Sequence, residues 1–138
     1  MSYLKVKKAI LTKLLTVVSA NDLALENKKF DPSNKELWYA AYFLPTSSET
    51  MGKTIASSDE QRGIFQVSVF VNINRFDYDD SQLTAIDAIL SAFTYNTNLV
   101  YNGQKIDILN SEVNSGSESE AWYQRDISIN YLTFSERV

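Results

Sequence analysis

Two residue types that carry much of protein chemistry are missing from this 138-residue chain, because it has no cysteine and no histidine. Without cysteine there is no disulfide and no thiolate nucleophile, and without both residues a zinc site of the usual kind is excluded. The side chain most often used as a general base near neutral pH is absent as well. Any catalysis would therefore depend on carboxylates, lysine, tyrosine or serine.

Basic residues are scarce in the second half of the chain. Residues 76–138 hold ten acids against Lys105, Arg125 and Arg137, whereas residues 1–20 hold four lysines and no acid. The formal net charge of the whole chain is −4. Because phosphate contacts need clustered lysine and arginine, this acidic body argues against broad nucleic-acid binding.

No apolar stretch reaches the roughly 18 residues that a membrane span needs. Residues 4–18 have early lysines and an apolar middle, which is also the pattern of a secretory signal. Lys13 interrupts that middle, however, and most of the apolar residues fall on one half of a helical wheel. The stretch is predicted to be an amphipathic packing helix, with a cleaved signal as the alternative.

The clearest strand pattern lies at residues 62–73, where apolar residues occupy every second position and so share one face. These residues are Phe65, Val67, Val69, Val71 and Ile73. We expect a central strand here. Residues 37–44 are apolar or aromatic throughout and end at Pro45, which is typical of a strand buried on both faces. Such a strand must be covered twice, by helices of its own domain or by another subunit, and it therefore indicates self-association.

The remaining elements follow from local signals. A weak alternation predicts a short strand at 22–27. A second helix is expected from about Asp80 to Phe93, with Asp79 as N-cap and Gln82 completing a capping box. Its predicted apolar stripe consists of Leu83, Ile86, Leu90 and Phe93. Asn102-Gly103 predicts a hairpin between strands at 99–101 and 104–109, and residues 122–132 alternate as a last strand with one wet face.

This order of elements predicts an α+β fold. We expect a two-layer sandwich in which two helices pack on one face of a largely antiparallel sheet. The length is that of one domain, residues 1–138. Residues 46–62 and 110–120 show no period and are predicted to be long loops, which in compact domains are often functional.

No pattern of catalytic or ligand-binding residues stands out. Met51-Gly52-Lys53-Thr54 resembles part of a phosphate loop, but Ser47 stands where that motif needs a glycine. Two groups of carboxylates, at 49–60 and at 77–80, could be read as a cation site or an acid/base pair, but the second group lacks the fixed spacing and turn glycine of a calcium loop. We therefore predict no catalytic, cofactor or metal site, and the chain is not expected to be an enzyme.

Three segments in this order resemble the tail terminator-like proteins of long-tailed bacteriophages. They are the aromatic strand Trp38–Pro45, the segment Arg62–Val69 that contains Gly-Ile-Phe-Gln-Val, and Ala121–Arg125 at the start of the last strand. The resemblance implies a small α+β subunit that is made in the host cytoplasm and assembles into a homo-hexameric ring in the virion. The ring would sit on the head-proximal end of the tail tube, stop addition of tail tube protein, and offer its other face to the head-completion proteins of the neck in head-tail joining.

Contacts in such an assembly are expected from the 46–62 loop and from the aromatic strands. The residues we predict to make them are Glu49, Met51, Lys53, Asp59, Arg62, Trp38, Tyr42 and Trp122. No cofactor, membrane or specific nucleic acid is expected as a partner. Two alternatives stay open: a related head-tail connector or tail-completion protein, and a monomeric α+β module that binds a ligand or partner.

Overall fold

The structure, a computed structural model, describes residues 3–26, 29–32, 35–50, 58–74, 78–95, 97–114, 116–119 and 121–136. At residues 3, 45–50, 58–60, 78, 119 and 135–136 the description covers the backbone only. The elements in chain order are α1 (Tyr3–Leu14), the 3-10 helix η1 (Ala20–Asp22), β1 (Leu23–Leu25), β2 (Leu37–Thr50), β3 (Ser58–Asn72), α2 (Tyr78–Ala92), β4 (Asn98–Tyr101), β5 (Gln104–Val113), β6 (Ser117–Ser119) and β7 (Trp122–Glu136).

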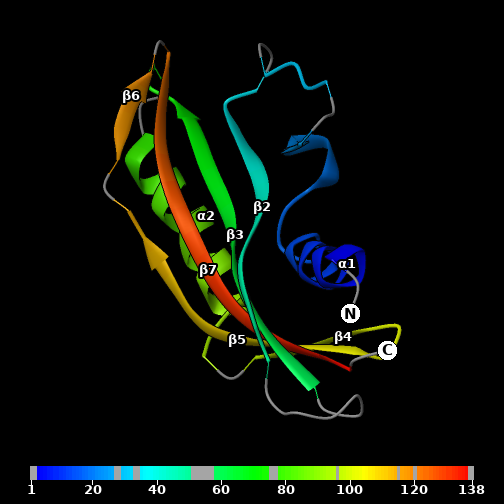
Figure 1. Ribbon diagram of the computed structural model, residues 1–138. Coiled ribbons are helices and arrows are strands. Elements are labelled where there is room, and N and C mark those ends of the chain that lie inside the picture. Colours follow the sequence, from blue (N-terminus) through cyan, green and yellow to red (C-terminus); the bar gives the residue numbers. More distant parts are fainter. Residues whose placement is uncertain are drawn as a thin grey trace.

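The strands described form one seven-stranded sheet, in the order β1-β2-β3-β7-β5-β4, with β6 added beside β7. β1 runs parallel to β2, and the other described pairs are antiparallel. Figure 1 shows that this mixed sheet is curled into a half-barrel, with α1 and α2 beside it. The prediction of an α+β fold is confirmed, while the two-layer sandwich stays a prediction.

β3 is the central strand that the alternation predicted. It lies between β2 and β7, and its odd-numbered residues from 65 to 71 are almost completely buried. They belong to one core cluster that also includes Ile10 and Leu14 of α1, Phe93 after α2, and Ile127 of β7. Both helices therefore pack on the side of the sheet that carries the odd-numbered residues of β3.

The N-terminal segment is the amphipathic helix that its pattern predicted, but the helix is shorter than the pattern. After Leu14 the backbone continues in tighter turns, in which Thr16 N–H and Val17 N–H donate to Lys13 and Leu14 carbonyls. Leu4, expected on the buried face, is 61% exposed. The face of α1 that enters the core is thus narrower than half of a helical wheel.

The second helix is confirmed, but the predicted capping box is wrong. The helix begins at Tyr78, so Asp79 and Asp80 lie in its first turn. Gln82 is fully buried, and its Nε2 donates to the backbone oxygens of Val69 and Tyr123 at 2.9 and 3.0 Å. The glutamine therefore joins α2 to β3 and β7 instead of capping the helix.

The buried stripe of α2 is therefore rotated around the helix axis relative to the predicted stripe. Its fully or nearly fully buried members are Gln82, Ile86, Ile89 and Phe93. Leu83, predicted to be buried, is 39% exposed. The glutamine amide takes the core position because two carbonyl oxygens of the sheet need donors there.

The Asn-Gly hairpin is confirmed, since Asn102 and Gly103 have positive φ values of 47° and 85°. The two segments predicted to be loops are largely strand. β2 continues through Pro45 to Thr50, which pairs with Asp59 of β3. A register shift after Pro45 accommodates the proline, as a bulge can.

The segment 110–120 differs from the prediction in the same way. β5 extends to Val113, and β6 pairs with β7. These stretches are rich in serine and in acidic residues, and strands disfavour acidic residues. Pairing with β3 and β7 outweighs that weak preference, because it satisfies the backbone hydrogen-bonding groups of the polar stretches.

Candidate assembly surface

The side of the sheet that faces away from the helices offers the candidate site. We call it the outer face. It carries the even-numbered residues of β3 and β7, and those of β2 up to Leu44, because the odd-numbered residues point into the core. Since α1, α2 and the core cover the other side, the outer face is the side of the sheet on which a partner can dock.

An aromatic stack covers one end of the outer face. Trp38 of β2 lies parallel to its cross-strand partner Phe70 of β3, with ring centroids 4.0 Å apart and an interplanar angle of 8°. Phe30 stacks on Trp38 at 5.2 Å, and Trp122 of β7 meets it edge-on at 5.9 Å. Such pairs add about 0.5–1.5 kcal/mol each beyond the burial of their surface. The second apolar side of β2 is thus covered in part by residues of its own chain.

Two apolar side chains further along β2 are exposed on the same face. Tyr42 is 38% exposed and Leu44 is 43% exposed. Their partners across the ladder are Gln66 and Ile64 of β3. Single exposed apolar residues are ordinary, but these two continue the strip that begins at the stack.

A polar network connects β3 and β7 beside this strip. The Ser68 hydroxyl donates to Asp126 Oδ1 at 2.6 Å, and the amides of Gln66 and Gln124 donate to Ser68 Oγ at 3.3 Å and to Asp126 Oδ1 at 2.8 Å. Ser68 is fully buried and has no histidine to activate it, because the chain contains none. The network therefore holds the two strands in register and does not form a nucleophilic site.

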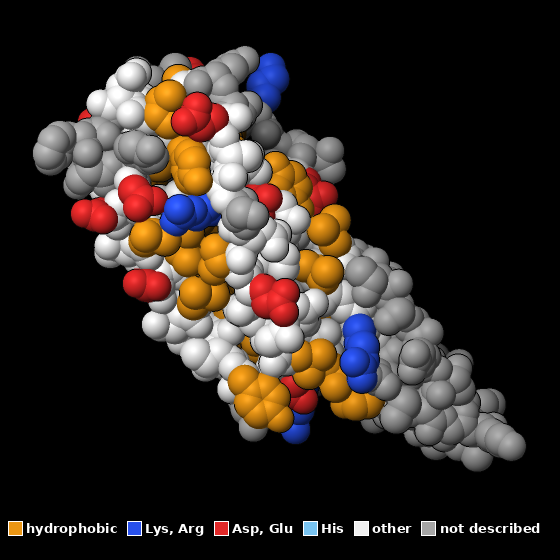
Figure 2. Space-filling model, turned by 90° about the vertical axis from the view of Figure 1, so that its left-hand side faces the viewer, with side chains coloured by type: hydrophobic (Ala, Val, Ile, Leu, Met, Phe, Trp, Pro, Cys, Tyr) orange, Lys and Arg blue, Asp and Glu red, His pale blue; other side chains and the backbone are white. Residues whose placement is uncertain are grey.

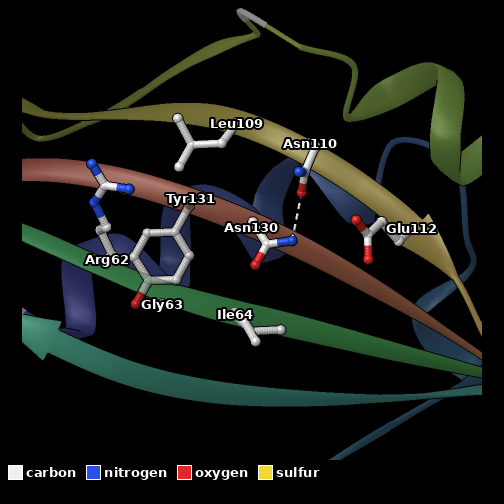
Figure 3. A pocket seen from close by; sticks show the side chains of 8 residues that line it. All are labelled: Arg62, Gly63, Ile64, Leu109, Asn110, Glu112, Asn130 and Tyr131. Carbon is white, nitrogen blue, oxygen red and sulfur yellow. Dashed lines mark hydrogen bonds between the residues drawn. The ribbon is translucent and has the colours of Figure 1, made fainter.

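Beyond Leu44 the outer face opens into a hollow of about 490 Å³ between β3, β5 and β7. Its lining residues are Arg62, Gly63, Ile64, Leu109, Asn110, Glu112, Asn130 and Tyr131. Figure 3 shows Arg62 and Glu112 toward opposite ends, with Asn110 and Asn130 between them. Asn130 Nδ2 donates to Asn110 Oδ1 at 2.5 Å. One cation, one anion and two amides suit the polar contacts of a protein interface.

Close packing between β3 and β7 underlies this hollow. Gly63 is paired with Tyr131, and a Cβ on Gly63 would overlap the tyrosine ring. That ring is buried and stacks on Phe43, with centroids 6.0 Å apart and planes at 11°. Only glycine leaves room for this approach, which gives the Gly-Ile-Phe-Gln-Val segment a structural reason for its glycine.

The structure brings together four of the eight residues predicted to make contacts. Trp38 and Trp122 meet in the aromatic stack, Tyr42 is exposed beyond it, and Arg62 lines the hollow. All four lie on the outer face. They were predicted from two different signals, the aromatic strands and the unpatterned segment, and the ladder of β2, β3 and β7 places them on one surface.

The other four predicted residues belong to the segment that contains the end of β2 and the start of β3. The backbones of Glu49 and Asp59 belong to the ladder, where Glu49 pairs with Glu60, but their side chains are not described. Met51 and Lys53 lie outside the described residues. Their role in contacts therefore stays a prediction.

Sequence reasoning missed the residues that complete the hollow. Asn110 and Glu112 were assigned to a loop, and Asn130 to a wet strand face without a neighbour. The alternation of β7 put Asn130 on the correct face. The pairing of Asn130 with Asn110 across β5 and β7 gives no signal in the sequence, because the bulge between Ile108 and Asn110 shifts the register.

The acidic residues of the described segments do not gather into a metal site, since no group of three or more potential ligands is found there. Asp79 instead forms an ion pair with Arg125, with Oδ1 and Nη2 3.2 Å apart. Within the same segments, no helix is both long enough and apolar enough to cross a bilayer.

One side chain of the core has a shifted ionisation. Burial raises the pKa of the Tyr39 hydroxyl above its ordinary value, and the Asp22 carboxylate adds to the shift. The folded state therefore holds the tyrosine proton more tightly than the unfolded chain does. Stability from this difference is fully present below about pH 10 and is lost as the pH rises through the raised pKa.

We therefore expect Tyr39→Phe to flatten the loss of stability above pH 10. The free energy of unfolding of the wild type should fall more steeply with pH there, by up to about 1.4 kcal/mol per pH unit from this residue. Urea denaturation between pH 8 and pH 11 measures both slopes, with Tyr95→Phe as a control at an exposed position. Equal slopes for wild type and Tyr39→Phe would contradict the assignment.

Comparison with known families and structures gives a consistent result. The sequence model of a family described as phage tail terminator protein matches residues 5–131. A solved chain whose name states no function has 23% identity and a TM-score of 0.72, over 96% of each chain. A chain in the virion of a native gene transfer agent particle has 13% identity and a TM-score of 0.60, over 97% of this chain and 100% of its own. Among curated proteins no significant match was found.

Proposed function

Because this chain belongs to the phage tail terminator protein family, we propose that it forms a homo-hexameric ring on the head-proximal end of the tail tube. A structural role in a phage tail follows from the family itself. The ring ends polymerisation of the tail tube protein, and its other face receives the head-completion protein of the neck. The observation that carries this proposal is the family match, which begins in α1 and extends into β7.

The likeness to a virion chain supports the same assignment. A chain of the gene transfer agent particle shares the fold over nearly the whole length of this protein. By analogy with that chain, this protein is a component of an assembled particle. An assembly protein works by shape and placement, so it needs no catalytic group.

The outer face is the surface that we assign to the tail tube. It joins an exposed apolar strip, made by Tyr42 and Leu44, to a hollow with Arg62 at one end. Aromatic residues and arginine are the types most enriched in protein interfaces, where buried aromatic anchors supply much of the affinity. We further assign contacts in the assembly to Glu49, Met51, Lys53 and Asp59.

Growth of purified tail tube protein with and without this chain tests the function. We expect wild-type protein to shorten the tubes, and Tyr42→Ser to need about tenfold or more protein for the same effect, since loss of an interface anchor costs about 2 kcal/mol. Tyr95→Ser is the matched control, because Tyr95 is 72% exposed and lies away from the outer face. Tubes that reach the same length with and without wild-type protein would contradict the proposal.

A further inference from the structure

The two helices carry charges of opposite sign. Every charged residue of α1 is a lysine, at positions 5, 7, 8 and 13. Every charged residue of α2 is an aspartate, at positions 79, 80 and 87. Figure 1 shows α1 and α2 beside different parts of the curled sheet. The charge asymmetry of the sequence is thus also an asymmetry of the surface.

The basic side also presents an unfilled apolar hollow. Leu4, Lys8 and Leu11 of α1 and Leu15 just after it recur at three- and four-residue spacing, so they form a second stripe, on which Leu4, Lys8 and Leu15 are exposed. Leu11 and Leu15 line a hollow of about 380 Å³ between α1 and β1. The rest of its lining is Ala20, Leu23, Ala24, Leu25, Lys29 and Phe30. We call the α1 stripe and this hollow the basic helix surface.

The exposed face of α2 is complementary in charge to the basic side. Leu83 is exposed on α2, with Asp80 and Asp87 three and four residues away and therefore on the same part of the helix. Figure 2, which views the α2 side of the molecule, shows Asp and Glu side chains spread among exposed hydrophobic ones, with fewer Lys and Arg side chains. We call the exposed face of α2, with Leu83, Asp80 and Asp87, the acidic helix surface.

We propose that the basic helix surface of one copy binds the acidic helix surface of the next copy. Leu83 enters the hollow between α1 and β1, and Asp80 and Asp87 face Lys8 and Lys29, which are exposed beside that hollow. The two surfaces differ, so the contact is head-to-tail and closes into a ring when the rotation between copies allows it. This inference rests on the proposed ring and names the surfaces that build it.

Charge complementarity of this kind has two consequences. It determines which surface of one copy binds which surface of the next. A basic surface repels another basic surface, and like charges in contact are strongly unfavourable. It also makes association sensitive to ionic strength, since exposed charges are screened within about 10 Å at 0.1 M salt. Assembly of the wild type should therefore weaken as salt is raised.

A charge-swap experiment on the full chain tests the contact. One variant carries Lys8→Glu and Lys29→Glu, and the other carries Asp80→Lys and Asp87→Lys. Each variant alone has two surfaces of like sign, so we expect about tenfold or more weaker self-association than wild type, by sedimentation velocity over a concentration series. Lys105→Glu is the control, since it makes the same kind of charge change on an exposed residue of β5.

Mixing the two variants in equal amounts should restore assembly, because each reversed surface then meets a surface of opposite sign. Alternating copies close only into even-numbered rings. Restored assembly also shows that both variants are folded, so loss of assembly by either one alone cannot come from misfolding. Variants that assemble as well as wild type, a mixture that does not recover, or a wild type that stays monomeric would each overturn the inference.

The outcome for the contact is separable from the outcome for the proposed function. If wild-type rings shorten tail tubes and both charge-reversed variants assemble as well as the wild type, the helix contact is refuted and the terminator role stands. If each charge-reversed variant alone loses assembly but wild-type rings leave tube length unchanged, the contact is supported and the terminator role is refuted.

Discussion

Phe65→Ala is expected to remove about 3–5 kcal/mol from the free energy of unfolding, the usual cost of deleting a buried aromatic ring. Phe65 is 1% exposed on the central strand, between its ladder partners Phe43 of β2 and Ile129 of β7. Neighbours on both sides are held by their own pairing, so the cavity cannot close by a local shift. Urea denaturation of both proteins measures the difference.

Phe134→Ala is the control for this change, since Phe134 is 44% exposed near the end of β7. We expect it to cost clearly less than Phe65→Ala, because almost half of the Phe134 surface is already in contact with water. A loss for Phe65→Ala as small as that for Phe134→Ala would mean that β3 is not the centre of the core.

Gly63→Ala is expected to destabilise the fold by about 1–3 kcal/mol, although it adds only one methyl group. That methyl group would overlap the buried Tyr131 ring, which stacking on Phe43 holds in place. Thermal unfolding measures the effect, and about 1 kcal/mol corresponds to roughly 3–5 °C in a chain of this length.

A double-mutant cycle with Tyr131→Leu isolates the cause. Tyr131→Leu removes the ring atoms that the new methyl group would meet, so Gly63→Ala should cost much less in that background. If the cost of Gly63→Ala is the same in both backgrounds, the close approach of Gly63 and Tyr131 is not the reason that glycine stands here.

The strong local patterns of the sequence predicted most of the elements that the structure has. Alternation found β3 and β7, helical periodicity found α1 and α2, and Asn102-Gly103 found the β4–β5 hairpin. The failures arose where tertiary contacts outweigh local preference. Pro45 does not end β2, because β2 is paired with β3 on one side and a bulge absorbs the proline. The sequence position of Gln82 predicted a capping residue, but its side-chain amide donates hydrogen bonds to two carbonyl groups of the sheet.

The candidate surface could be predicted only in part. Residue types pointed to Trp38, Tyr42 and Trp122, because large aromatic residues on both sides of a strand need covering. That Trp38 is covered largely by Phe30 and Phe70 of the same chain depends on register, which the sequence does not encode locally. The opposite charges of α1 and α2 were visible in the sequence, but where each helix lies on the curled sheet needed the fold.

Imaging of finished particles by electron cryomicroscopy is the most direct measurement of the proposed role. The expected result is density for this chain as one hexameric ring at the head-proximal end of the tail tube, with the outer face of each copy against the last layer of tube protein. Density for the chain along the whole tube, at the opposite end only, or as isolated single copies would contradict it.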